Sequence, residues 1–321
     1  MTRTANAGTA QQSSPVVRVR NLTKKYRDFT ALDSVSFELE PKKIYGLLGR
    51  NGAGKTTIMS ILTAQGFRSS GDIEVFGGDP YENDKILSRI CFIRESQKYP
   101  DDFRPKHAFA SAKLFFENWD QELADRLVED FQLPLNRRIK KLSRGQLSAV
   151  GVIIGLASRA ELTFFDEPYL GLDAVARQLF YDRLVEDYSE FPRTIVLSSH
   201  LIDEVSNLLE HVIVIDKGRI IIDDDAENIR GGAVTVVGPA VKIEGFLAGR
   251  EILHRENFAS LASVTIDGQL SPEERAEAHQ LGLELAPVSL QQLVVRKTIN
   301  SAAEDFTEKT VESEFAKEAR R

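Results

Sequence analysis

Short apolar runs alternate with amphipathic stretches through the second half of the chain. Three of these runs are rich in β-branched or aromatic residues, at 162–165, 194–198 and 212–215. Such runs are typical of strands that are buried on both faces of a parallel sheet. The stretches between them, 173–188 and 202–210, have the apolar spacing of helices that cover a sheet. The pattern therefore predicts an α/β fold whose ligand chemistry lies at the carboxyl ends of the strands.

Strand patterns come first in the N-terminal half, and helical patterns follow them. Strands are expected at 16–19, 37–39, 44–48 and 72–76. Helices are expected at 105–117, at 121–131, and after Ser143. The stretch from 105 to about 158 is therefore expected to be largely helical.

The composition shifts at Gly231-Gly232, and a new series of short elements follows. Strands are expected at 233–237, 263–267 and 283–285, and helices at 241–248, 272–281 and 290–297. Ser271 and Glu274 form a capping box, with Pro272 at the first helical position. This segment has its own apolar periodicity, so residues 233–298 are expected to form a small α+β domain.

Composition narrows the setting in which the chain works. A net charge of −7 does not favour a nucleic-acid partner. The single cysteine, Cys91, lies in an apolar run, which excludes a disulfide framework and favours a small buried side chain. No apolar run approaches the ~18–20 residues of a membrane span. We therefore expect a cytoplasmic protein, with a flexible tail at 1–15 and a charged tail at 299–321.

A glycine-rich loop, GRNGAGKTT, follows the strand predicted at 44–48. Its glycines allow backbone N–H groups to face a polyphosphate, Lys55 can reach the β- and γ-phosphates, and the Thr56 hydroxyl can bind Mg²⁺. The positions expected to contact nucleotide are Gly49, Arg50, Asn51, Gly52, Ala53, Gly54, Lys55, Thr56 and Thr57. The alternative is a glycine-rich turn with a nearby lysine. The complete motif favours a nucleoside triphosphate, bound with Mg²⁺.

Two further segments carry candidate chemistry. Asp166 and Glu167 end the apolar strand at 162–165, where Asp166 can hold the Mg²⁺ hydration shell and Glu167 can orient an attacking water. Alternatively, these carboxylates are a helix cap or surface charges. The segment 142–146 reads LSRGQ and opens a helix, so Ser143 and the helix N-terminus can form an anion site. A plain N-cap explains Ser143 equally well.

Together these motifs resemble the ATP-binding cassette family over residues 16 to about 225. The matching segments are the Walker A loop at 49–57, the LSGGQ signature at 142–146, Walker B with its catalytic glutamate at 162–167, the D-loop at 171–173, the switch histidine His200, and Tyr26, where the family stacks an aromatic on adenine. All six occur in the family's order.

The resemblance implies a P-loop NTPase core of the RecA-like type, with an antiparallel β subdomain and an inserted helical subdomain at about 96–158. The nucleotide-binding domain is expected to cover 16–230 and the accessory domain 233–298.

The resemblance also implies that two cassettes pair head to tail around two ATP molecules. Across the dimer, the γ-phosphate is expected to contact Ser143 and the N–H of Gly145, and Gln146 is expected to belong to the same nucleotide-binding set. His200 is expected to contact the γ-phosphate within its own chain, and Asp173 to couple the two sites. Tyr26 is expected to stack on the base. Alternatively, Tyr26 is a half-buried loop aromatic and His200 a neighbour of a helix N-cap.

Three positions depart from the family pattern. Glu95 stands where the family has the Q-loop glutamine, and its carboxylate is expected to approach Mg²⁺. Arg144 replaces the first signature glycine and adds charge near the partner's ATP. Arg50 replaces a common proline in the loop. In having an arginine in the signature, the chain resembles a subset of bacterial cassettes that are linked to the export of peptides, antibiotics or lipids.

The implied function is that of an ATP-hydrolysing subunit of an exporter, as a homodimer or heterodimer. It would power a separate transmembrane permease and lie at the inner face of the cell membrane through that permease. An exposed basic and aromatic set (Lys98, Tyr99, Phe103, Arg104) can grip a permease helix, unless it is an ordinary mixed surface. The alternatives are a soluble non-transport cassette and a regulatory ATP-binding protein, the latter suggested by Glu95 and Arg144.

Overall fold

The computed structural model describes residues 14–95, 97–247, 249–250, 252–258 and 260–295. The chain divides into two compact units. The first contains the residues up to Lys43 and from Thr56 to Val196, and the second contains Ile44–Lys55 and the residues from Leu197 onward. The boundaries predicted for the cassette and accessory domains stay predictions. The charged tail at 299–321, and all but the last two residues of the tail at 1–15, lie outside the described residues.

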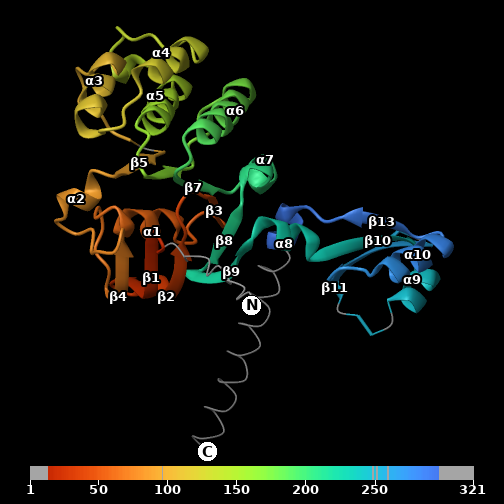
Figure 1. Ribbon diagram of the computed structural model, residues 1–321. Helices are drawn as coiled ribbons and strands as arrows, with labels where there is room; N and C mark the ends of the chain where they lie inside the picture. The colour runs from red at the N-terminus through yellow and green to blue at the C-terminus, as the bar shows by residue number, and fades with distance from the viewer. Residues whose placement is uncertain (1–13, 96, 248, 251, 259, 296–321) are drawn as a thin grey trace, which may run out of the picture. The chain divides into compact units, whose positions relative to one another are not determined.

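An antiparallel three-stranded sheet in the first unit has β1 (Val17–Tyr26) between β2 (Phe29–Leu39) and β4 (Ser70–Val75) (Figure 1). β1 and β2 are longer than predicted because they form a continuous hairpin, from the pair Val17 and Leu39 to the pair Tyr26 and Phe29. Register shifts interrupt the alternation along β1, so the pattern beyond residue 19 did not read as a strand.

A second sheet of six strands has the order β5-β6-β7-β3-β8-β9. Its members are β3 (Ile44–Leu48), β5 (Ile90–Arg94), β6 (Leu162–Asp166), β7 (Thr194–Ser199), β8 (His211–Asp216) and β9 (Arg219–Asp225). β3 runs parallel to β8, and β5 runs parallel to β6. β3, β6 and β7 are buried at every position, as their apolar runs predicted. β9 was not predicted, because this antiparallel edge strand is largely exposed and ends in three aspartates.

The helical stretch of the first unit contains α3 (Pro105–Phe115), α4 (Gln121–Asp130) and α5 (Arg144–Ala157) (Figure 1). α3 and α4 begin at the predicted residues. α5 packs against both of these helices and against β5. It is buried continuously from Ala149 to Ala157, because it is apolar on all sides there. Other α-helices described in this unit are α1 (Lys55–Leu62), which begins in the second unit, α2 (Asp84–Leu87) and α6 (Ala174–Glu190).

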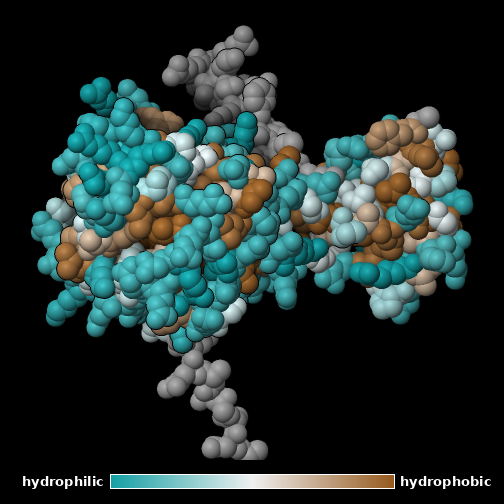
Figure 2. Space-filling model, turned by 90° about the horizontal axis from the view of Figure 1, so that it is seen from above, coloured by the Kyte–Doolittle hydropathy of each residue, from teal (hydrophilic) through white to brown (hydrophobic). Residues whose placement is uncertain are grey.

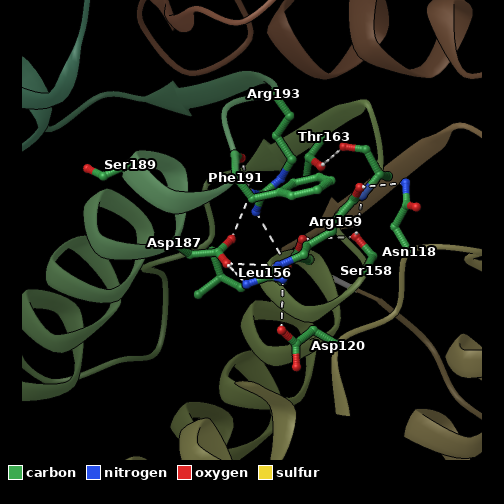
Figure 3. Close-up of polar contacts among 12 residues, drawn as sticks. Asn118, Asp120, Leu156, Ser158, Arg159, Thr163, Asp187, Ser189, Phe191 and Arg193 are labelled. Atoms are coloured by element: carbon green, nitrogen blue, oxygen red, sulfur yellow. Dashed lines mark hydrogen bonds and ion pairs between the residues drawn. The ribbon is translucent and has the colours of Figure 1, made fainter. Parts of the chain in front are cut away.

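A chain of four charged side chains joins α4, α5, α6 and the start of β7 (Figure 3). Arg159 Nη1 lies 2.9 Å from Asp120 Oδ2, and Arg159 Nη2 lies 2.9 Å from Asp187 Oδ1. Asp120 is also the N-cap of α4. Arg193 Nη1 completes the chain at 2.7 Å from Asp187 Oδ2. A buried charge is tolerated when it has a charged partner. Here acidic and basic side chains alternate along the chain of four, so each charge has a partner of opposite sign.

The C-terminal part of the second unit has the order β-α-β-β-α-β (Figure 1). Its elements are β10 (Ala233–Pro239), α9 (Ala240–Phe246), β11 (Ile252–Phe258), β12 (Leu261–Asp267), α10 (Pro272–Gln280) and β13 (Glu284–Pro287). The strands form an antiparallel sheet in the order β11-β12-β10-β13. Ile243 and Ala278 bring the two helices onto Val236, Val264 and Ile266 of the sheet.

Several predicted elements differ from the structure in this unit. β11 was not predicted, because it is an exposed edge strand with mostly polar residues. The single helix predicted at 202–210 is instead one α-helical turn, α7 (Ile202–Val205), and a 3₁₀ turn, Ser206–Leu208. A short helix, α8 (Ala226–Gly231), follows β9 and was not predicted. The last predicted helix is present at 290–295, and its two final residues lie outside the described part.

None of the helices in the described part of the chain combines the length and the apolar character that a membrane crossing requires.

Candidate nucleotide site

The glycine-rich loop leaves β3 at Leu48 and enters α1 at Lys55. Gly52 has φ +81°, a left-handed conformation that favours glycine. A Cβ on Gly49 would lie 2.2 Å from the carbonyl oxygen of Ile215 in β8, so no side chain fits there. The loop is also held by a backbone hydrogen bond of 2.9 Å, in which the N–H of Gly218 donates to the Ala53 carbonyl. These constraints fix the loop against the end of β8.

Lys55 folds back over the loop that precedes it. Its Nζ donates to the carbonyl of Gly49 at 2.7 Å and to that of Arg50 at 3.2 Å. The side chain is buried, which is rare for lysine and is tolerated here because polar partners surround the ammonium group. The loop therefore holds a positive charge beside its own backbone, where a polyphosphate would bind.

The next residue along α1, Thr56, contacts the end of β6. Its Oγ1 donates to Asp166 Oδ2 at 2.7 Å, and Asp166 is buried. A hydroxyl and a carboxylate oxygen side by side match the ligands that Mg²⁺ prefers. Within the described residues no group of three or more His, Cys, Asp or Glu side chains gathers to hold a metal. Magnesium is usually bound through one or two protein oxygens together with substrate phosphates, so this small donor set fits it.

Glu167 follows Asp166 directly and has an unusual backbone. It is buried, and its φ of +51° is uncommon for a residue with a side chain. The hydroxyl of Tyr169 donates a hydrogen bond to Glu167 Oε2, and Tyr169 is itself buried. Strained backbone of this kind clusters at functional sites. Tyr169 was not predicted as a site residue. Its position two residues after a candidate catalytic carboxylate was the feature of the sequence that could have indicated it.

The signature segment begins α5 with a complete capping box. Ser143 Oγ accepts from the N–H of Gln146 at 3.2 Å, and Gln146 Oε1 accepts from the N–H of Ser143 at 3.1 Å. Gly145 lies against the loop after β6, where a Cβ would come within 2.7 Å of the Gly171 carbonyl oxygen. Asp173 caps the next helix, since Oδ1 accepts from the N–H of Ala176 at 2.8 Å. Ser143 and Asp173 are thus helix caps, and their roles toward nucleotide stay predictions.

The two main departures from the family pattern contact each other. Arg144 Nη2 lies 2.8 Å from Glu95 Oε1. In the parallel pairing of β5 with β6, Arg94 lies opposite Asp166, so Glu95 follows at the same edge of the sheet. Our prediction that Glu95 approaches Mg²⁺ stays a prediction.

Tyr26 and His200 both lie at strand ends, which was predicted for His200 only. Tyr26 is the last residue of β1 and is half exposed, with Lys24 Nζ 4.6 Å from the centroid of its ring. This contact is a cation–π interaction. His200 directly follows β7 and is exposed. Stacking on a base by Tyr26 and contact with the γ-phosphate by His200 stay predictions.

The proposed permease-gripping set is less exposed than predicted. Lys98 is exposed, whereas Tyr99, Phe103 and Arg104 are partly buried. Burial raises the pKa of the Tyr99 hydroxyl. The Phe103 carbonyl is also taken up, because it accepts from the N–H of Ile139 at 2.7 Å. Lys98 is therefore the member of this set that offers most surface to a partner.

Comparison with known proteins identifies the family. A family model described as "ABC transporter" matches residues 32–170. The lantibiotic transport ATP-binding protein SrtF of Streptococcus pyogenes is 30% identical over 227 residues, covering 67% of this chain and 94% of that protein. The Nod factor export ATP-binding protein I of Cupriavidus metallidurans is 30% identical over 214 residues, covering 65% of this chain and 70% of that protein.

A solved structure, described as an ATP-binding subunit of an ABC transporter, has a TM-score of 0.61 at 21% identity. The alignment covers 67% of this chain and 92% of that one, and it confirms the predicted α/β P-loop NTPase fold. The sequence relatives, the family model and the fold all indicate an ATP-binding cassette. Membership of this family makes the chain an ATPase. This chain belongs to the ABC transporter family, as an ATP-binding subunit.

Proposed function

We propose that this ATP-binding subunit hydrolyses Mg-ATP between two paired cassettes and thereby drives a separate transmembrane permease in the direction of export. The observation that carries the proposal is the contact between Thr56 and Asp166, with Glu167 next along the chain. It brings the end of the phosphate loop to the end of a buried strand, where the chemistry of this fold is expected.

Each residue of the site has a distinct task in this proposal. The loop backbone and Lys55 bind the phosphates, and Thr56 and Asp166 would hold Mg²⁺, which would supply positive charge to neutralise the phosphates. Glu167 orients the attacking water and accepts its proton, and the Tyr169 hydroxyl holds the Glu167 carboxylate in place.

The second half of each site comes from another cassette. Ser143 and Gly145 open α5, a helix of 14 residues whose positive N-terminus favours phosphate. Asp173 follows Gly171, the glycine that Gly145 approaches closely. A homodimer supplies both halves from this chain, and a heterodimer supplies one of them from a related cassette.

The export direction and the permease are supported by the relatives. One relative is named for lantibiotic transport and another for Nod factor export, and both are ATP-binding proteins. An exposed apolar pair, Leu114 and Phe115, ends α3 and offers a contact for a membrane partner. Figure 2 shows apolar residues at the surface among hydrophilic ones. Through such a partner the chain would lie at the cytoplasmic face of the membrane.

The experiment is to purify the chain together with the membrane protein encoded beside it and to measure ATPase activity. We expect Lys55→Ala to abolish ATP turnover. Glu167→Gln should retain ATP and accumulate dimers in size-exclusion chromatography with Mg²⁺. A Glu167→Gln chain that hydrolyses ATP at the parental rate would refute the role given to Glu167. ATPase activity that the membrane protein leaves unchanged would contradict the coupling.

A further inference from the structure

Arg144 and Glu95 form an ion pair between two segments of the first unit that are 49 residues apart in sequence. Arg144 is the first residue of α5, and Glu95 directly follows β5. The Nη2 to Oε1 distance is 2.8 Å, and the side chains are 68% and 42% exposed. The pair is therefore well formed but open to water, where either group can exchange its partner.

The stem of Arg144 rests on a third segment, the loop after β6. A Cβ on Gly171, which has φ +95°, would lie 2.7 Å from Arg144 Cγ and 3.1 Å from Ser148 Oγ. Ser148 Oγ donates to the Leu170 carbonyl at 2.6 Å and so fixes this loop to α5. From the start of α5, Arg144 thus contacts both other segments: its Cγ lies against the loop after β6, and its guanidinium lies beside Glu95.

We propose that Arg144 and Glu95 are a pair of positioning residues that exchange partners when ATP binds. Without nucleotide, Glu95 holds the guanidinium beside its own sheet. With nucleotide, Arg144 leaves Glu95 and contacts a phosphate of the ATP bound by the facing cassette. The inference rests on the proposed function, because only a paired cassette places a phosphate before α5.

Energetics favour such an exchange. An exposed ion pair contributes about 0–1 kcal/mol, so little is lost when it opens. Arginine binds phosphate through two parallel hydrogen bonds, and such charge-assisted bonds are among the stronger ones. The released Glu95 carboxylate would remain at the sheet edge that carries Asp166, close to the proposed Mg²⁺ ligands.

The test compares four full-length chains that all carry Glu167→Gln, so that ATP is retained. They are the parent, Glu95→Gln, Arg144→Gln and the double variant. For each we would measure, by analytical ultracentrifugation with Mg²⁺, the ATP concentration that gives half-maximal dimer. Glu95→Gln should lower this concentration by about two- to fivefold, the worth of an exposed ion pair. Arg144→Gln should raise it, and adding Glu95→Gln to Arg144→Gln should change nothing further.

A charge swap separates exchange from simple structural support. Glu95→Arg with Arg144→Glu restores an ion pair but puts a carboxylate where the phosphate contact is expected. Under the proposal this chain needs at least about tenfold more ATP, equivalent to ~1.4 kcal/mol. Recovery of the parental value would overturn the exchange, because a merely structural pair works in either polarity.

Glu161→Gln is the matched control. Glu161 forms a bidentate pair with Arg89 at 2.6 and 2.7 Å, at the opposite end of the same two strands, and it is similarly exposed. We expect it to leave ATP-dependent dimerisation unchanged. If Glu95→Gln had the same effect with Arg144 present and with Arg144→Gln, the proposed exchange between the two residues would be overturned, and the proposed function would stand. A parent that neither retains ATP nor dimerises would instead overturn the proposed function, and the pair with it.

Discussion

Asp187 and Arg193 form an ion pair whose two side chains are each only 2% exposed. It is the most buried link of the chain of charges that runs through Arg159 to Asp120 (Figure 3). Burial disfavours each charge separately, and burial lowers the pKa of the Arg193 guanidinium while Asp187 counteracts this. Since neither charge can reach water, each depends on the other to remain in the folded chain.

Removing one member of this pair should therefore destabilise the chain strongly. We expect Arg193→Met to lower the free energy of unfolding by about 3–5 kcal/mol, because it leaves the Asp187 carboxylate buried with one cation fewer. The measurement is urea denaturation followed by circular dichroism. Replacing both residues, with Asp187→Leu added, should recover part of the loss. Glu161→Gln breaks an exposed pair and should cost about 1 kcal/mol or less. Equal losses in the buried and exposed variants would contradict this account.

The contact between Tyr169 and Glu167 predicts a selective loss of turnover. Tyr169→Phe keeps the buried ring and removes only the hydroxyl that donates to Glu167 Oε2. A hydrogen bond to a charged group is worth about 1.5–3 kcal/mol, so kcat for ATP hydrolysis should fall by about tenfold or more. ATP affinity, measured by equilibrium binding, should stay within twofold of the parent's because the phosphate loop is untouched. A parental kcat in this variant would show that the hydroxyl does not position the carboxylate.

His211 predicts a pH-dependent contribution to stability. Burial lowers the pKa of the imidazole, but hydrogen bonds of 2.8 Å to both Asp223 and Asp225 outweigh burial and raise it. A raised pKa in the folded state means that the stabilisation is fully present below the unfolded pKa of about 6.5. It is then lost as the pH rises through the folded value. The urea midpoint should fall over this range, and His211→Gln should flatten the fall. An unchanged slope in that variant would exclude His211 as the cause.

Cys91 should be inert in the folded chain. Burial raises the pKa of its thiol to about 12, although a hydrogen bond with Ser158 opposes the shift. Almost no thiolate is then present at pH 8, and the thiolate is the reactive form. Iodoacetamide should label the native chain far more slowly than the same chain unfolded in about 6 M guanidinium, where the thiol has its ordinary pKa of about 8.5. Rapid labelling of the native chain would mean that β5 opens to solvent.

The strands that carry the candidate site could be predicted from the sequence almost to the residue. β3 was predicted with its observed bounds, and β6 extends only one residue, Asp166, beyond the predicted run. Both are buried on two faces, so their residues are mostly apolar, and glycine or carboxylates mark their ends. The edge strands β9 and β11 were not predicted, because one side of each faces water and their polar residues hide the period of two.

Side-chain contacts across the fold could not be predicted in the same way. The sequence indicated that Glu95 and Arg144 each depart from the family pattern, but not that they touch, because loop and helix N-terminus meet only in three dimensions. Tyr169 was overlooked for a related reason. The left-handed backbone at Glu167 turns the two side chains toward each other, and nothing in the residue pattern indicates that conformation.

The hydrogen bond from Gly218 to Ala53 joins the phosphate loop to a turn that leads toward the C-terminal sheet. Gly218 lies in the turn between β8 and β9, and β9 continues through α8 into β10 of the C-terminal sheet. Residues 49–55 of the loop belong to the same compact unit as that sheet. Gly218 therefore serves both as a support for the loop that carries Lys55 and as part of the hairpin whose second strand leads into the C-terminal sheet.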